Sequence, residues 1–133
     1  MKSILRSKLL FLLVALGYTL ALLTASLIKI ESESLPVRFE HADKLFHFGA
    51  YFTLTILWHL FYFIHRRTKE YHPYWVICLL AVVFGIIIEI LQGSATTYRG
   101  FEWLDIVANT LGVVLASVAL VVFNRFNHKV KIV

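Results

Sequence analysis

Four long apolar runs dominate this 133-residue sequence, and each is as long as a helix that crosses a lipid bilayer. The hydrocarbon core of a membrane needs about 20 apolar residues in a helix, whose backbone polar groups are satisfied internally. The runs do not alternate between apolar and polar residues, so they do not fit the strands of a membrane β-barrel. The sequence therefore predicts an all-α, polytopic membrane protein: a four-helix bundle with spans at residues 9–28, 45–64, 74–93 and 104–123.

The composition agrees with a membrane protein and excludes two other classes. Charged residues make up 16% of the chain, against about 25% in an ordinary soluble domain. The net charge of +5 is spread along the chain, so no basic patch for a nucleic acid forms. No linker divides the sequence, and we expect residues 1–133 to form a single membrane domain whose partners are lipids and, as an alternative, another membrane protein.

The loops predict the orientation of the spans. Lys and Arg gather in the N-terminal tail, in the loop between the second and third spans, and in the C-terminal tail. By the positive-inside rule, both termini lie in the cytoplasm (N-in/C-in). The first run is too long for the apolar part of a signal peptide, so we expect it to remain a span.

Polar side chains of three spans are predicted to meet near the non-cytoplasmic surface. Asp43, His47 and Tyr51 follow one another at intervals of four residues, so they share one face of the second span. The third and fourth spans and their short loop place further polar residues at that depth. The full set predicted to bind a ligand is Asp43, Lys44, His47, Tyr51, Glu89, Gln92, Arg99, Asp105 and Asn109.

Glu89 carries the strongest functional signal in this set. It lies inside an apolar run and near the C-terminal end of its helix, where the helix dipole opposes a negative charge. A carboxylate at the centre of a span costs about 2.5–3.5 kcal/mol, and less toward the ends. We therefore expect Glu89 to be protonated or to meet a cation at the end of the bundle, from the set Lys44, His47 and Arg99.

The other polar residues also have structural interpretations. Asp43 and Asp105 suit the first turns of their helices, where an anion is favoured. Asn109, with Gly112 and Ala116, is typical of close helix packing. We expect Cys78 to pack in the interior, and His59 and His65 to face lipid headgroups.

The ordered pattern of these residues resembles the VanZ-like family of small bacterial integral membrane proteins. The matching motifs are D-K-x-x-H-x-x-x-Y from Asp43, E-x-x-Q from Glu89, an Arg at position 99, and D-x-x-x-N-x-x-G from Asp105, together covering about residues 43–116. Thr97 and Tyr98 stand where family members often have Pro-Gly. The resemblance implies a multi-pass protein of the bacterial cytoplasmic (inner) membrane, in a family whose founding member is associated with teicoplanin resistance.

Three functions fit the predicted cluster. The first is binding of an anionic cell-envelope lipid or lipid-linked precursor by Lys44 and Arg99, with an effect on glycopeptide susceptibility as the implied phenotype. The second is a membrane-embedded enzyme that uses Glu89, His47 and Asp105 as candidate catalytic acids and bases; whether the chain is an enzyme stays open. The third is a buried ion-pair network that fixes the bundle or a contact with a partner membrane protein.

A metal site is a weaker alternative. His41, Asp43, His47 and Glu89 supply oxygen and nitrogen ligands, but their spacing matches no established metal motif. We therefore expect no metal and no cofactor.

Overall fold

The computed structural model describes residues 2–28, 42–65, 74–95 and 101–130, and the side chains of residues 6–28, 42–64, 74–94 and 101–126. The described residues form the helices α1 (Lys2–Leu27), α2 (Ala42–His65), α3 (Tyr74–Ala95) and α4 (Trp103–Val130). Each is long and apolar enough to cross a membrane. The prediction of an all-α protein with four spans is confirmed. Both α2 and α4 are longer than the predicted spans, so Asp43 and Lys44 belong to the first turn of α2.

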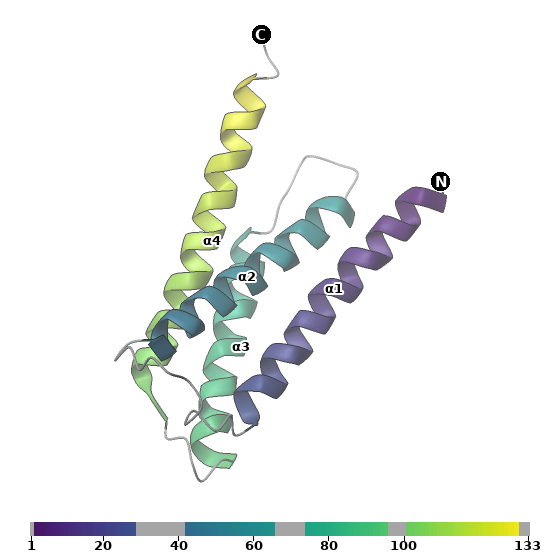
Figure 1. Cartoon of the computed structure of the whole chain (residues 1–133). Helices are drawn as coiled ribbons and strands as arrows, with labels where there is room; N and C mark the ends of the chain where they lie inside the picture. Colours follow the sequence, from purple (N-terminus) through teal and green to yellow (C-terminus); the bar gives the residue numbers. More distant parts are fainter. Residues whose placement is uncertain (1, 29–41, 66–73, 96–100, 131–133) are drawn as a thin grey trace.

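The helices run alternately in opposite directions. The start of α1 and the end of α4 lie at the same end of the bundle, whereas the starts of α2 and α4 and the end of α3 lie at the other (Figure 1). We call the latter the distal end, because it is opposite the chain termini. This arrangement agrees with two tails on one side of a membrane. That the tails face the cytoplasm stays a prediction.

Helix α2 crosses the centre of the bundle and contacts each of the other three helices, most extensively α4 (Figure 1). Gly112 of α4 makes this approach possible. A Cβ atom at Gly112 would lie only 2.3 Å from the carbonyl oxygen of Phe48 in α2. Ala116, one turn further along α4, is fully buried. Small residues thus let the backbones of α2 and α4 come together, as the sequence predicted for this face.

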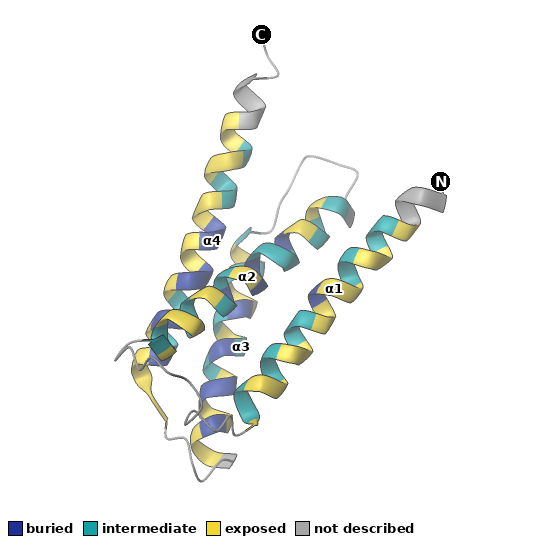
Figure 2. Ribbon diagram, viewed as in Figure 1, coloured by how far each residue is buried: buried dark blue, intermediate teal, exposed yellow. Residues whose placement is uncertain are grey.

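Helix α1 is less buried inside the bundle than the other three helices. Most of its side chains are exposed or half-buried (Figure 2), as expected for a span surrounded by lipid. Hydrogen bonds join it to α2: for example, the Tyr18 hydroxyl donates to the carbonyl oxygen of Ala50 at 3.1 Å, and Trp58 Nε1 donates to Thr19 Oγ1 at 3.1 Å. Polar contacts between helices are effective in lipid because water does not compete for them.

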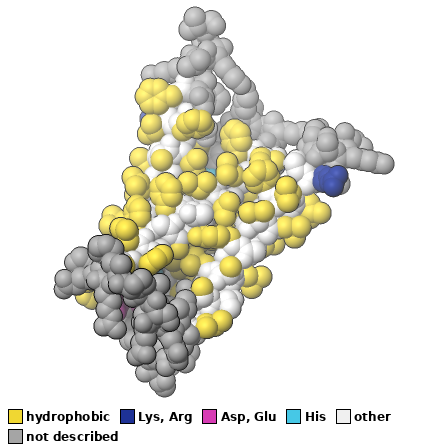
Figure 3. All heavy atoms as spheres, in the orientation of Figure 1, with side chains coloured by type: hydrophobic (Ala, Val, Ile, Leu, Met, Phe, Trp, Pro, Cys, Tyr) yellow, Lys and Arg dark blue, Asp and Glu magenta, His cyan; other side chains and the backbone are white. Residues whose placement is uncertain are grey.

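Both the surface and the interior of the bundle contain apolar side chains. Hydrophobic side chains cover the face of the bundle seen in Figure 3. The interior combines an apolar core with several buried polar side chains. A bilayer accepts apolar groups on the outside, but polar groups inside it need partners. Several of the buried polar residues make specific contacts between helices. The buried polar residues are Thr55, His59, Glu89, Gln92, Asp105, Asn109 and Ser117.

The expectation that His59 faces lipid headgroups is wrong. His59 is only 2% exposed. Its Nδ1 donates to the carbonyl oxygen of Thr55 at 2.8 Å, and its ring lies against that of Tyr74 with centroids 5.3 Å apart. Tyr74 in turn accepts a hydrogen bond from Asn124 of α4. His59 turns inward because α3 and α4 offer it an aromatic and polar surface, which the sequence of α2 does not reveal. His65 falls outside the described side chains.

Cys78 packs as the sequence predicted. It is half-buried against the apolar core cluster formed by Tyr51, Leu54, Ala81 and Val113.

Candidate functional site

An ion pair between α2 and α4 forms the centre of the distal end. The Lys44 ammonium donates to Asp105 Oδ1 and to Glu102 Oε2, each at 2.7 Å. The first turns of the two helices provide Lys44 and Asp105, and Glu102 directly precedes α4. The two carboxylates differ in environment, because the Asp105 side chain is 1% exposed and that of Glu102 is 51% exposed. Lys44 therefore pairs with the buried carboxylate of Asp105 and with the solvent-exposed carboxylate of Glu102.

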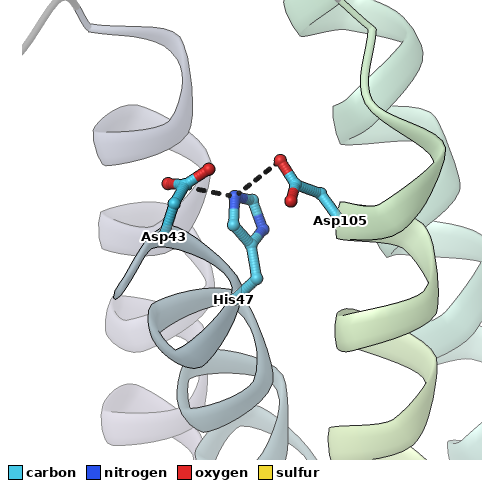
Figure 4. Close-up of side chains that lie close together, drawn as sticks. All are labelled: Asp43, His47 and Asp105. Atoms are coloured by element: carbon cyan, nitrogen blue, oxygen red, sulfur yellow. Dashed lines mark ion pairs between the residues drawn. The ribbon is translucent and has the colours of Figure 1, made fainter. Parts of the chain in front are cut away.

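His47 lies next to this ion pair, one turn further along α2. Its Nε2 is 3.5 Å from Asp105 Oδ2 and 3.9 Å from Asp43 Oδ1 (Figure 4). Its Nδ1 is 3.1 Å from Asn109 Oδ1. An amide oxygen only accepts hydrogen bonds, so Nδ1 carries a proton and donates it. Asn109 thereby orients the imidazole so that Nε2 faces two carboxylates.

Glu89 reaches the cluster through the backbone. Its Oε1 accepts a hydrogen bond of 2.8 Å from the peptide N–H of Glu102, and the residue is 1% exposed. The sequence predicted a proton or a cation for Glu89. That remains a prediction, and the described contact places the Glu89 carboxylate at the start of α4, where peptide N–H groups and the helix dipole favour a negative charge.

Tyr51 and Gly85 form the inner boundary of the cluster. A Cβ atom at Gly85 would lie 3.0 Å from Tyr51 Cε1 and 3.4 Å from Asn109 Cβ, so the absence of a side chain there leaves room for both. The Tyr51 hydroxyl and Asn109 Nδ2 are buried, and neither makes a hydrogen bond with a residue that the structure describes. Two buried donors thus lie beside the ion pairs.

The predicted site residues are not all brought together. Asp43, Lys44, His47, Asp105 and Asn109 form one continuous set of contacts. Glu89 joins through Glu102, as described above.

Gln92 instead donates from Nε2 to the carbonyl oxygen of Ser26 at 2.8 Å, which connects α3 to α1. Arg99 and His41 lie outside the described residues.

Glu102 is a site residue that the sequence analysis did not include in the predicted set. One signal points to it: Glu102 precedes Asp105 by three residues at the start of an apolar helix, and such a pair shares one face. With Glu102 included, the described cluster holds four carboxyl groups and one ammonium group: Asp43, Glu89, Glu102 and Asp105 with Lys44.

Comparison with known proteins identifies a family to which the sequence is similar. The VanZ/LLP1 family model matches residues 5–124, which is most of the sequence. The chain belongs to the VanZ/LLP1 family. The match begins in α1, so the VanZ/LLP1 domain extends beyond the 43–116 region that carries the recognisable motifs. Together with the four apolar helices, it identifies a multi-pass membrane protein.

A relative of this VanZ/LLP1 protein occurs in a eukaryote. An uncharacterized protein of Schizosaccharomyces pombe is 34% identical over 83 residues, which cover 62% of this chain and 49% of the yeast protein. The chain thus matches about half the length of that relative. No solved structure matches the chain.

Proposed function

We propose that this VanZ/LLP1 protein binds the anionic headgroup of a cell-envelope lipid, or of a lipid-linked envelope precursor, at the distal end of α2, α3 and α4. The observation that carries the proposal is the position of Lys44 between a buried and an exposed carboxylate. The proposal places the protein in the bacterial cytoplasmic membrane, with the distal end on the non-cytoplasmic side.

The two ion pairs of Lys44 differ in how readily they can be exchanged. A hydrogen bond between charged groups contributes about 1.5–3 kcal/mol, and the Asp105 side chain is 1% exposed, so the contact of Lys44 with Asp105 persists. An exposed pair contributes about 0–1 kcal/mol, so a phosphate or carboxylate headgroup can replace the side chain of Glu102. In the absence of a ligand, the Glu102 carboxylate then occupies the position on Lys44 that the headgroup would take.

Two helix starts support anion binding at this end. The N-termini of α2 and α4 both lie there, and each adds partial positive charge from unsatisfied N–H groups. Asn109, which contacts His47, is a further polar group at this end. Binding of a lipid-linked precursor at this place would also give the protein a route to alter glycopeptide susceptibility.

Native mass spectrometry of the purified full chain tests the proposal. A polyprenyl phosphate is titrated against the uncharged polyprenol of the same length. We expect the phosphate to bind at least tenfold more tightly, because a hydrogen bond to a charged group contributes about 1.5–3 kcal/mol. Lys44→Gln should remove this preference. Glu102→Gln should raise phosphate affinity by up to about fivefold, because it removes the competing carboxylate.

Arg125→Gln is the matched control. Arg125 is an exposed cation near the opposite end of α4, so its loss changes the net charge equally without touching the site. Phosphate binding should stay within about twofold of the unmodified protein. If Lys44→Gln and Arg125→Gln weaken binding equally, the distal end is not the binding site.

A further inference from the structure

Three potential metal-ligand atoms face one another at the distal end. One atom each of Asp43, His47 and Asp105 lie within 4.8 Å of one another (Figure 4). His47 Nε2 is 3.5 Å from Asp105 Oδ2 and 3.9 Å from Asp43 Oδ1. In a tetrahedral zinc site with bonds of about 2.0–2.2 Å, ligand atoms are separated by about 3.4 Å. The two distances from His47 Nε2 are therefore within about 0.5 Å of this separation, and the distance between the two carboxylates is at most 4.8 Å.

The groups behind this triangle hold it in the orientation a metal requires. A histidine that binds a metal through one nitrogen typically donates from the other to an oxygen, which fixes the ring. Asn109 provides this oxygen, and it is 2% exposed. Asp105 is fixed similarly, because its other oxygen accepts from Lys44 at 2.7 Å. The imidazole lone pair and two carboxylate oxygens consequently point to a common centre.

The chemistry of the three ligand groups selects the kind of ion. One imidazole with two carboxylates suits a first-row transition ion such as Zn²⁺, whereas Ca²⁺ takes six to eight oxygen ligands. The Asp43 side chain is half exposed, so an ion can enter from solvent, and the described residues supply three of the four ligands of a tetrahedral site.

We propose that Asp43, His47 and Asp105 bind a divalent transition-metal ion of the zinc class, with Asn109 as the residue that orients His47. This inference goes beyond headgroup binding, because the metal site is complete without a lipid. A bound dication would add positive charge beside Lys44, so it would also favour an anionic headgroup.

The experiment measures binding of Zn²⁺ alone to the purified full chain in detergent, after chelator treatment, by calorimetry and by metal analysis after dialysis. We expect one ion per chain with a Kd of about 10 μM or lower. Co²⁺ provides a second readout, since loss of the nitrogen ligand in His47→Gln should change its visible absorption.

Asp43 and Glu102 form a matched pair of variants. Their side chains are 50% and 51% exposed at the same end of the bundle, but only Asp43 belongs to the triangle. Asp43→Asn should weaken Zn²⁺ binding at least tenfold, whereas Glu102→Gln should change it less than about threefold. Asn109→Leu should weaken it about tenfold through the orientation of His47. Circular dichroism verifies that each variant keeps its helices.

Three outcomes would overturn the metal site. The first is the absence of saturable Zn²⁺ binding. The second is an equal loss in Asp43→Asn and Glu102→Gln, which would indicate non-specific attraction to acidic groups. The third is an unchanged Co²⁺ spectrum in His47→Gln. None of these results depends on lipid binding, so a failure here leaves the headgroup proposal to its own test.

Discussion

Substitution of Gly112 by alanine tests whether the site depends on the close approach of α2 and α4. The added Cβ would lie 2.3 Å from the carbonyl oxygen of Phe48 and 3.1 Å from the amide nitrogen of Phe52. The closest ordinary contacts between carbon and a carbonyl oxygen are about 3.3 Å. The helices must therefore separate by about 1 Å, because backbone atoms cannot move away by changing rotamer.

The expected loss of stability combines two opposing terms. Overpacking of this kind costs about 1–3 kcal/mol, and the backbone clash favours the upper part of that range. Alanine recovers about 0.5–1 kcal/mol relative to glycine within a helix. We therefore expect Gly112→Ala to lower the free energy of unfolding by about 1–2 kcal/mol. Asp105 lies about two turns from Gly112 on α4, so separation of the helices should also weaken the ion pairs at the distal end.

The assay is thermal unfolding in detergent, followed by the loss of helical circular dichroism. Gly112→Ala should melt roughly 3–8 °C lower than the unmodified protein. Gly49→Ala is the control, since Gly49 lies next to Phe48 in α2 and a Cβ there would meet nothing within 4 Å. It should melt at the same temperature or slightly higher. If the two variants melt alike, the close approach at Gly112 is refuted.

Two further substitutions test the contacts that hold the cluster and α1 in place. Asp105→Asn should lower stability by about 1.5–3 kcal/mol in the same melting assay, because it removes a charge-assisted hydrogen bond to a buried carboxylate. Glu102→Gln should cost about 0–1 kcal/mol, and similar values for the two variants would contradict the difference in burial. Gln92→Leu removes the hydrogen bond to the Ser26 carbonyl and should increase hydrogen exchange in α1 through a loss of about 0.6–1.7 kcal/mol. The control is Ser94→Ala, because the Ser94 hydroxyl donates only to carbonyl groups within α3 among the described contacts. This variant should leave the hydrogen exchange of α1 unchanged. Equal exchange in the two variants would exclude a role for Gln92 in holding α1.

The spans and the depth of the polar residues followed from the sequence, because a bilayer imposes a length on each helix and a cost on each buried charge. The interval of four residues from Asp43 to His47 set one face of α2, and the motifs indicated the family. Contacts between helices were harder to predict. The spacing of residues along one helix does not give the distance to the backbone of the helix packed against it. At Gly112, the distance between the α2 and α4 backbones decides which side chains of α2 reach α4.

By itself, then, the sequence determined that four helices cross the membrane and that three of them carry polar residues to one end. Only the tertiary structure decided the partners: the Glu102 backbone for Glu89, α1 for Gln92, and the interior rather than the headgroups for His59. The physical reason is that a helix fixes the height and direction of its own side chains, whereas the crossing of neighbouring helices determines which groups come within hydrogen-bond distance.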